Sequence, residues 1–512
     1  MKSEEQVSLR DEAQGKHSMT EFEYVATFCH FILKLTESQL LYDLDVESDR
    51  LAIIQSLLLM SFWSATPGDS KGGWHWMGIA VSLGLTIGIH RKLDDRGYNV
   101  KERRLRRRIW WSCYIRDRLL ALGMSRPMRI RDGEFDTPML TLADFDIDEL
   151  EPDHVAHLDS SIVEIKVQRR LAEMCIKMAE LCTHIGPVLS LHFSFLPADD
   201  SRLYVTDQIG QTTALLFASN QSFNIEDVQA YDQKLQDLLL GLPESSIYRS
   251  ANSADQSASS LCIMHAALLQ IVFFSVVSAL HRPLLNAQGR LVGDPCELQE
   301  FRTLSQCRVY EAAKEVSKMN HEVHSHEMDG YLLPTAVTLQ LPAIITHLKR
   351  LQSSSKGVTE ILTSLFHCLS VLERLQAVYV GADLVMAFAL EIMKGTGITS
   401  QIGQNSKING LIYKGQTYSA DSFQPYTMDG LLPTQSEWVS GIQGCSETNL
   451  GPFGAISNNI QVLRPMYVGN PTPDAQSAKP SPLDNMAFDD CLDMLIGFDS
   501  LQNIDLDWVT RL

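Results

Sequence analysis

The sequence predicts an all-α protein, in which a large multi-helix domain is followed by a disordered linker and an acidic carboxyl-terminal tail. Three observations lead to this prediction. Apolar residues recur at helical spacing from about residue 21 to 395, almost no stretch alternates strictly between apolar and polar residues, and the composition changes after Lys394. Recurrence at three and four residues is typical of amphipathic helices, whereas strict alternation would indicate strands.

The helical pattern occurs in a series of segments separated by short polar breaks. Pro243 and the Ser/Ala-rich run that ends at Ser260 indicate a surface loop before the most apolar of these segments. The segments that we expect to be helices are 22–35, 51–62, 74–89, 101–122, 162–184, 225–240, 261–280, 296–319, 341–351, 358–380 and 383–393.

Composition divides the chain into four regions. Residues 1–20 are expected to form a flexible leader, and residues 21–395 the helical domain. Residues 396–480 are dominated by Gly, Ser, Asn, Gln, Thr and Pro, and they carry few charges. Such a segment buries too little apolar surface to offset the entropy of ordering it, so we expect a disordered linker. Residues 481–512 form the acidic tail.

Charge and cysteine usage limit the classes of protein to consider. With 62 acidic and 43 basic residues the formal net charge is -19, so the average field repels nucleic acid and anionic lipid. The ten cysteines form no Cys-x-x-Cys pair, which is typical of reduced thiols in a cytosolic or nuclear protein and predicts neither a zinc cluster nor a disulfide scaffold. The polar start, Met1 to Gln6, is unlike a secretory signal peptide.

One segment, 261–280, is long enough for a membrane span and carries no formally charged residue. His265, Gln270, Ser275 and Ser278 interrupt its apolar surface, and no second segment of this kind is present. We therefore favour a buried core helix over a membrane span.

The tail mixes carboxylates with large apolar side chains. From Ser481 to Thr510 there are seven aspartates and no Lys or Arg. Mutual repulsion keeps such a segment extended, which leaves its apolar side chains available to a partner, as in activation domains. The alternative is a terminal helix that docks on the protein's own core. The candidate activation contacts are Phe488, Leu492, Leu495, Ile496, Phe498 and Trp508.

A basic run occupies Lys101 to Arg108, where six of eight residues are Lys or Arg, and two tryptophans follow it. Basic residues beside aromatic rings can grip phosphates and stack on bases, and they can also serve in nuclear import. Helical spacing favours a third interpretation, in which the aromatic residues belong to the core and the arginines form a solvated helix face. Asp117 is placed to form a partly buried ion pair with Arg118 or Arg126.

An ordered series of short motifs carries a family resemblance. The motifs are Ile53–Met60, Trp74–Ala80, Leu83–Leu85, Gly88–Arg91, Arg106–Trp111, Asp117–Arg118, Arg126–Ile130, Asp132–Pro138, Leu280–Leu285, and Cys307 with Glu311–Ala313. In this order they resemble the middle homology region of fungal binuclear zinc-cluster transcription factors, the fungal-specific transcription factor domain. Trp74–Gly78 and Leu333–Val337 are most similar to the cutinase-transcription-factor-like branch.

The signature residues of this resemblance are expected to be structural. They are Trp74, Trp76, Gly78, His90, Arg91, Arg107, Trp110, Trp111, Asp117, Arg118, Arg126, Pro127, His281, Arg282 and Pro283. One departure from the family pattern is Ser125, which stands where the family commonly has Gly before Arg-Pro.

The resemblance implies a nuclear regulator of RNA polymerase II genes, such as those of a secondary-metabolite cluster or of lipid and cutin breakdown. The family's zinc needs an amino-terminal cysteine cluster, which this sequence lacks, so we expect no cofactor in this chain. DNA would be reached through a zinc-cluster partner or through residues encoded upstream. Expected partners are the transcription machinery or a coactivator, a homodimer or zinc-cluster partner, and a small-molecule effector.

Other functional signals are weak. His321 to Glu327 holds three histidines but lacks the His-Glu-x-x-His spacing of a metal site, and no nucleophile elbow occurs. Gly84 and Gly88, four residues apart in a helical stretch, are expected to permit close helix packing. We therefore predict a protein that is not an enzyme. The alternatives are an all-helical enzyme or a membrane-associated protein that acts on apolar small molecules.

Overall fold

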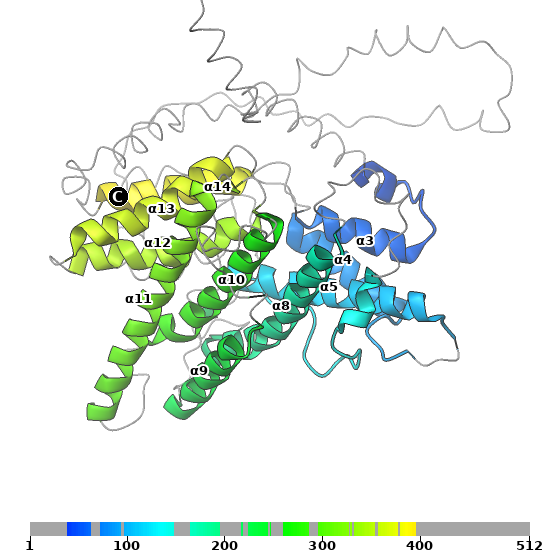
Figure 1. Cartoon of the computed structure of the whole chain (residues 1–512), viewed down its shortest axis with the longest axis horizontal. Coiled ribbons are helices and arrows are strands. Elements are labelled where there is room, and N and C mark those ends of the chain that lie inside the picture. The colour runs from blue at the N-terminus through cyan, green and yellow to red at the C-terminus, as the bar shows by residue number, and fades with distance from the viewer. Residues whose placement is uncertain are drawn as a thin grey trace, which may run out of the picture. The chain divides into compact units, whose positions relative to one another are not determined.

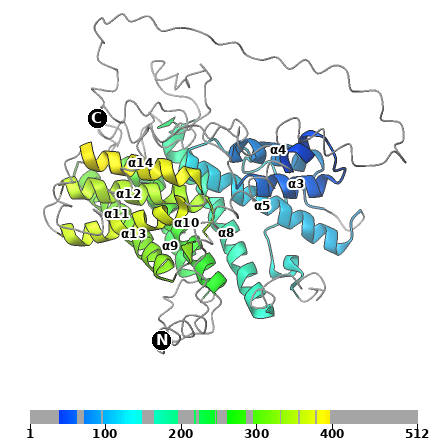
Figure 2. The same cartoon turned by 90° about the horizontal axis from the view of Figure 1, so that it is seen from above.

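The computed structural model describes residues 38–62, 72–93, 97–147, 164–194, 217–218, 224–243, 246, 260–285, 295–326, 328–329, 332–353, 357–376 and 379–395. Across these ranges the chain is built from helices, which confirms the all-α prediction (Figures 1 and 2). All of the described residues belong to one compact unit. The leader, the predicted helix 22–35, the linker and the tail with its six candidate contacts lie outside the described residues.

The first group of helices contains most of the signature motifs. It consists of α3 (Arg50–Met60), α4 (Gly73–Thr86), α5 (Val100–Met124) and the short 3-10 helix η1 (Leu142–Phe145). The Asp49 side chain caps α3 by accepting a hydrogen bond from the Leu51 amide, and Asn99 caps α5 by accepting one from Glu102. Such caps satisfy amide donors that have no partner inside the helix, so both starts are specified locally.

Four helices follow, of which α8 packs against α5 and η1. They are α8 (Ile165–His192), α9 (Ile225–Leu240), α10 (Ser260–Leu285) and α11 (Pro295–Ser325). The strands β1 (Phe193–Ser194) and β2 (Phe217–Ala218) form one short antiparallel ladder, the sole sheet within the described ranges. The chain then folds into α12 (Thr335–Ser353), α13 (Val358–Gln376) and α14 (Val380–Gly395), which lie side by side in both views (Figures 1 and 2).

The buried side chains form two large clusters. The amino-terminal core unites apolar residues mainly of α3 to α5 and α8 to α10, and the carboxyl-terminal core unites those of α11 to α14. Helix α10 contributes to both cores, because Leu280 lies in the first while Met264 and Ala267 lie in the second. It is the single helix in the described part of the chain that is long and apolar enough to span a membrane, and 67% of its most apolar stretch is buried. This burial supports the prediction of a core helix.

Among the helices that run further than predicted, three contain an internal proline. The predicted ends at residues 184 and 280 and the predicted start at residue 341 correspond to helices that continue through Pro187, Pro283 and Pro342. A proline removes one backbone hydrogen bond and usually ends or kinks a helix, so sequence patterns alone stop there. Here the burial of the surrounding residues offsets that cost.

The prediction for the pair Gly84 and Gly88 was only half right. Gly84 lies in α4, where an added Cβ would lie 3.1 Å from the Ile89 side chain and 3.9 Å from Trp110. Gly88 lies beyond the end of α4 with a φ of +74°, and nothing lies within 4 Å of its missing Cβ. Its role is therefore to end the helix in the left-handed conformation rather than to allow close packing.

Candidate functional site: the polar framework around helix α5

Helix α5 carries the densest set of charged signature residues. Its first half is the basic run, and its second half is buried, with Trp110, Tyr114, Asp117 and Arg118 all inside the protein. The 25-residue helix is thus divided into a polar first half and a second half that lies in the core. The partners of each half decide what the helix can do.

The basic half of α5 is held by Asp144 of η1 and by Asp146, the residue that follows η1; we call these two aspartates the acidic clamp. Arg107 binds Asp144 at 2.8 Å, while Arg104 and Arg108 bind Asp146 at 2.6 and 2.7 Å. Three arginines of the expected solvated basic face are thus ion-paired and only partly exposed. This pairing disfavours a direct grip on a phosphate backbone by these three arginines.

The acidic clamp is positioned by its own local structure. The Thr141 amide donates to Asp144 Oδ2 at 2.8 Å, and the Thr141 side chain accepts from the Asp144 amide, which forms a capping box at the start of η1. The Thr141 hydroxyl also donates to Asp144 Oδ2, at 2.9 Å. Burial alone would raise the pKa of Asp146. The hydrogen bonds from Arg108 and Arg104 outweigh this effect and hold the pKa below its usual value. Our sequence interpretation missed both aspartates, although the Thr-x-x-Asp spacing was a signal for the cap.

Asp117 and Arg118 form the buried centre of the site, and the expected ion pair is present. Their side chains are 2% and 1% exposed, and Arg118 Nη1 lies 2.9 Å from Asp117 Oδ2. Asp117 also accepts hydrogen bonds from the amides of Arg129 and Ile130, and Arg118 donates to Asp132 at 2.7 Å. The pair therefore fixes the segment after α5 against the middle of that helix.

Trp74 stands at the edge of this segment and stacks with two arginines. The Arg129 guanidinium carbon lies 3.6 Å from the centre of the Trp74 ring, and that of Arg126 lies 5.1 Å away. The indole N–H donates to the Pro127 carbonyl at 3.3 Å. Gly78 lies beneath Arg129, and an added Cβ there would lie 2.5 Å from the guanidinium carbon, so the Arg129 side chain would have to shift. Four of the predicted signature residues thus lie together around Arg129, namely Trp74, Gly78, Arg126 and Pro127.

The remaining aromatic signature residues belong to the amino-terminal core. Trp76, Trp110 and Trp111 are buried. Trp111 donates to the Pro138 carbonyl at 2.8 Å, and the His90 ring lies 5.9 Å from that of Trp110. Arg91 differs, because its ion pair with Asp136 is exposed to solvent. The three tryptophans are therefore packed in the core and are not presented to a substrate.

Arg116 is a buried arginine that our sequence interpretation missed. Its guanidinium donates to the hydroxyl and carbonyl of Ser61 and to the Thr335 hydroxyl, and it lies over the Phe62 ring at 4.0 Å. All of these partners are neutral, and burial lowers the pKa of Arg116 to about 9. It joins the end of α3 to the start of α12, which no local sequence pattern could have revealed.

His281 lies in a separate polar group that connects three helices. Its Nε2 is 3.2 Å from Asp232 of α9, and its Nδ1 is 3.1 Å from the Ser305 hydroxyl of α11. Arg308 binds the other oxygen of Asp232 at 2.9 Å. Burial alone would raise the pKa of Asp232. Its contacts with His281 and Arg308 outweigh this effect and hold the pKa below its usual value. Asp232, Ser305 and Arg308 had not been predicted.

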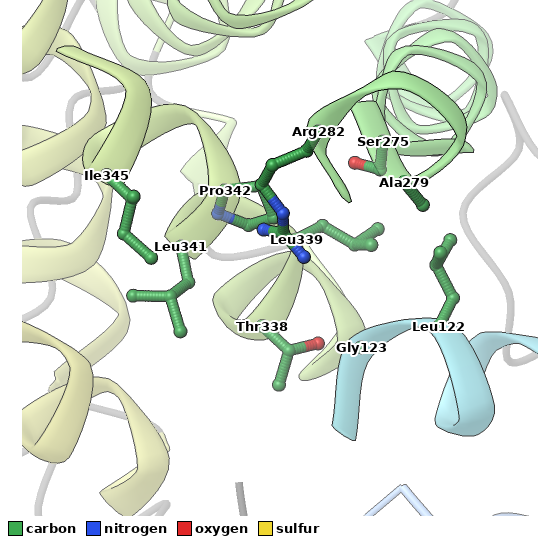
Figure 3. Close-up of a pocket in the computed structure, with 10 residues that line it drawn as sticks. All are labelled: Leu122, Gly123, Ser275, Ala279, Arg282, Thr338, Leu339, Leu341, Pro342 and Ile345. Carbon is green, nitrogen blue, oxygen red and sulfur yellow. The ribbon is translucent and has the colours of Figure 1, made fainter. Parts of the chain in front are cut away.

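This Ser-His-Asp order is reminiscent of a catalytic triad, but its setting is different. Ser305 and His281 are 0% exposed, so no substrate can reach the hydroxyl without unfolding of the surrounding helices. The group therefore acts as a connection between α9, α10 and α11. The next two signature residues, Arg282 and Pro283, also lie on α10, and Arg282 lines a small pocket against α12 (Figure 3).

The described residues offer little for metal binding or nucleophilic chemistry. No group of three or more His, Cys, Asp or Glu residues that could hold a metal ion occurs among them. Burial raises the pKa of Cys175 and of Cys368 to about 11, and it raises the pKa of the Cys113 and Cys182 thiols further. Protonated thiols of this kind are inert as nucleophiles and as ligands.

These contacts define the class of protein: a large helical domain whose charged and aromatic signature residues hold its helices together. Residues 4–238 match the model of the fungal specific transcription factor domain. The chain belongs to this family of fungal transcription factors, as the motif series had indicated. Transcription factors are not enzymes, and the family assignment therefore agrees with the prediction that the chain is not an enzyme.

Individual relatives are similar to most of this chain. Cutinase transcription factor 1 beta of Fusarium vanettenii is 38% identical over 356 residues, which is 69% of this chain and 40% of that protein. A transcription factor of Fusarium pseudograminearum strain CS3096 is 32% identical over 461 residues, or 85% and 50% of the two chains. Transcription factor cpaR of Aspergillus oryzae is 30% identical over 321 residues, or 62% and 51%.

The chain thus spans about half or less of the length of these relatives. No solved structure matches it.

Proposed function

We propose that this chain is a nuclear regulator of RNA polymerase II transcription. The single observation that carries this proposal is the match of residues 4–238 to the fungal specific transcription factor domain, together with relatives that are themselves transcription factors. The polar framework around α5 supports a binding role, since its charged residues are paired with one another rather than presented to a substrate.

In this proposal the mechanism is binding rather than chemistry. The helical domain controls activity through contacts with other segments or with a small-molecule signal, and the acidic tail recruits the transcription machinery or a coactivator. The acidic clamp occupies three of the arginines that could otherwise hold a phosphate backbone. DNA contact is therefore assigned to a zinc-cluster partner or to residues encoded upstream, with zinc held there.

The proposed target genes follow from the relatives' names and from the family resemblance. One relative is named as a cutinase transcription factor, and we extend this role to the present chain as control of lipid or cutin breakdown. Control of a secondary-metabolite cluster is the other target class. A comparison of transcripts between the wild type and a deletion strain, grown with and without cutin, distinguishes the two.

The activation tail is tested by fusing residues 481–512 to a foreign DNA-binding domain and measuring reporter output. We expect the fusion to raise output several-fold above the DNA-binding domain alone. Leu495→Ala with Trp508→Ala should abolish the increase, since these apolar side chains would enter the partner's groove. The matched control is Ser500→Ala, which leaves the apolar set intact. Equal output from the wild-type tail and the double variant would contradict the proposed recruitment.

A further inference from the structure

The segment before α3, residues 38–49, mixes exposed apolar side chains with acidic ones; it is the darkest blue stretch of Figure 1. Ten large hydrophobic residues are exposed in the described part of the chain, and four of them fall within seven consecutive positions of this segment. We call these four the apolar patch: Leu40, Leu41, Leu44 and Val46, which are 49% to 72% exposed. Single exposed leucines are common, whereas a cluster of them is typical of an interaction site.

The segment has a defined backbone conformation. It begins as a short helix, which ends in a Schellman motif. The Val46 amide donates to the Leu41 carbonyl at 3.2 Å, and inside this bond the Asp45 amide donates to the Tyr42 carbonyl at 3.0 Å. Asp45 adopts the left-handed conformation that this motif needs, with a φ of 52°. Tyr42 anchors the segment, because its ring packs edge-on against that of Trp76 with 5.7 Å between the ring centres.

This local structure gathers the apolar patch on one side of the segment. Leu40 and Leu44 are four residues apart, and Leu41 is three residues from Leu44, so the three side chains are neighbours on the helix surface. The Schellman motif turns the chain so that Val46 returns beside Leu41, a contact that commonly accompanies it. Because all four side chains are exposed, the apolar patch faces away from both cores.

Every charged residue of the segment is acidic. Four exposed carboxylates occur between residues 38 and 49, and no Lys or Arg does; they are Asp43, Asp45, Glu47 and Asp49. Glu47 accepts a hydrogen bond from the Asp49 amide at 2.7 Å, and Asp49 caps α3, so two of the carboxylates also fix the backbone beside the apolar patch. The surface is therefore complementary to an apolar groove that is bordered by Lys and Arg side chains.

Charge also distinguishes such a partner from two other occupants. A second copy of the chain that paired patch to patch would bring like carboxylates together, and each copy carries a net charge of -19. The apolar stretch 22–35 of this chain holds one Glu and one Lys, so it has no excess of positive charge to match the segment. An oppositely charged partner is favoured over both.

We propose that residues 38–49 form a second docking surface for the transcription machinery or a coactivator, through a partner groove that is apolar and bordered by basic side chains. This inference rests on the proposed function, in which the acidic tail recruits a partner of the same class. The segment repeats the composition of the tail, with carboxylates among large apolar residues, but in a conformation that is already formed. A preformed surface loses less conformational entropy on binding than a segment that must fold on its partner.

The first test fuses the full-length chain to a foreign DNA-binding domain and measures reporter output. Leu40→Ala with Leu44→Ala should reduce output several-fold, because it truncates half of the apolar patch. The matched control is Leu240→Ala with Leu304→Ala, which truncates two exposed leucines of α9 and α11 and should leave output unchanged. Both variants should melt close to the wild-type temperature, since the leucines are exposed. Equal output from the patch variant and its control would overturn the inference.

The same assay separates this inference from the proposed function. A wild-type fusion that fails to raise output would refute both. An active wild type with an equally active patch variant would refute the docking surface alone. An active tail variant, Leu495→Ala with Trp508→Ala, beside a weakened patch variant would refute recruitment by the tail and support the docking surface.

The contribution of charge is tested in the same fusion. Asp45→Asn with Glu47→Gln removes two charges and keeps the local acceptors, and Asn tolerates the left-handed conformation. Output should fall, because the attraction to a basic rim is weakened. The matched control is Glu226→Gln with Asp227→Asn, which removes two exposed charges from the start of α9. An equal fall in both variants would trace the effect to overall charge and contradict the inference.

The occupant is identified by a photo-crosslinking residue placed at Leu44 of the full-length chain in cells. We expect a crosslink to another nuclear protein, through a peptide that carries Lys or Arg beside apolar residues. This product should diminish when Asp45→Asn and Glu47→Gln are added. A crosslink to residues 22–35 of the same chain, a crosslink to a second copy, or no product at all would each overturn the inference.

Discussion

The two cores of the protein contain polar groups of opposite character. The amino-terminal core is built around buried ions, with Asp117 and Arg118 almost inaccessible to solvent. The carboxyl-terminal core contains a neutral network instead. Asn320 of α11 and Gln340 of α12 exchange hydrogen bonds through their amides, and Ser317 bonds to His347 at 2.8 Å.

This difference has an energetic consequence. A buried ion that loses its partner remains charged in a poorly polarisable environment. Removing one partner of a buried ion pair therefore costs about 3–5 kcal/mol of stability. A neutral amide that loses its partner costs about 1–3 kcal/mol. The amino-terminal core should therefore tolerate fewer substitutions than the carboxyl-terminal core, because a substitution at its centre lowers stability more. Charged residues inside an apolar pattern are also easier to notice in a sequence than neutral ones.

The largest effect is expected at the centre of the ionic core. Asp117→Ala leaves Arg118 without its buried carboxylate partner and leaves the amides of Arg129 and Ile130 without an acceptor. We expect the free energy of unfolding to fall by about 3–5 kcal/mol in chemical denaturation. Asp117→Asn retains an acceptor for the amides and should lose less. A loss below about 1 kcal/mol for the alanine variant would show that the ion pair is not central.

The neutral core should respond less, and in a way that can be reversed. Asn320→Ala removes both hydrogen bonds to Gln340 and should cost about 1–3 kcal/mol, because the Gln340 amide stays buried without a partner. Replacing both residues by apolar ones, Asn320→Leu with Gln340→Met, should restore most of that stability. The measurement is again chemical denaturation. A double variant less stable than the single one would mean that the amide pair itself is irreplaceable.

The acidic clamp at the margin of the ionic core predicts a pH dependence. Because the pKa of Asp146 is lowered in the folded protein, its carboxylate stabilises the fold above the ordinary Asp pKa and loses that effect as pH falls through the lowered value. Asp146→Asn should therefore lower stability by about 0.5–1 kcal/mol at pH 7, and the difference should shrink as pH falls below the ordinary Asp pKa of about 4 and vanish below the lowered value. Melting curves across pH measure this, and a constant difference from pH 7 to 3 would exclude an ionic origin.

The smallest expected effect is a gain in stability. Ser125 ends α5 with a φ of 46° and a ψ of 37°, the left-handed conformation that glycine adopts without strain. Ser125→Gly should raise stability by about 0.5–1 kcal/mol, since relief of strain exceeds the added entropy of the unfolded chain. Gly88→Ala, at a φ of +74° with open space around it, is the matched reverse change and should be destabilising. A loss of stability in Ser125→Gly would show that the serine side chain has a role of its own.

The order and approximate extent of the described helices could be predicted from the sequence. Helix α9 occupies Ile225–Leu240, as predicted, because apolar spacing and the Asn224 cap are local properties. The signature residues were also recognisable, and all fifteen lie within the described ranges. The gathering of Trp74, Gly78, Arg126 and Pro127 around one arginine was not predictable, because it depends on how α4 meets the segment after α5.

The sequence by itself determined the helical class, the family and the identity of the residues with unusual chemistry. Tertiary structure alone decided what those residues bind. Arg107 and Asp144 are 37 residues apart in the chain, and His281 and Asp232 are 49 apart. Helical spacing relates residues that are three or four positions apart, so it cannot predict pairings between residues so distant in the chain. Tolerance of the three internal prolines was likewise decided by packing, because burial offsets a local cost that the sequence shows in isolation.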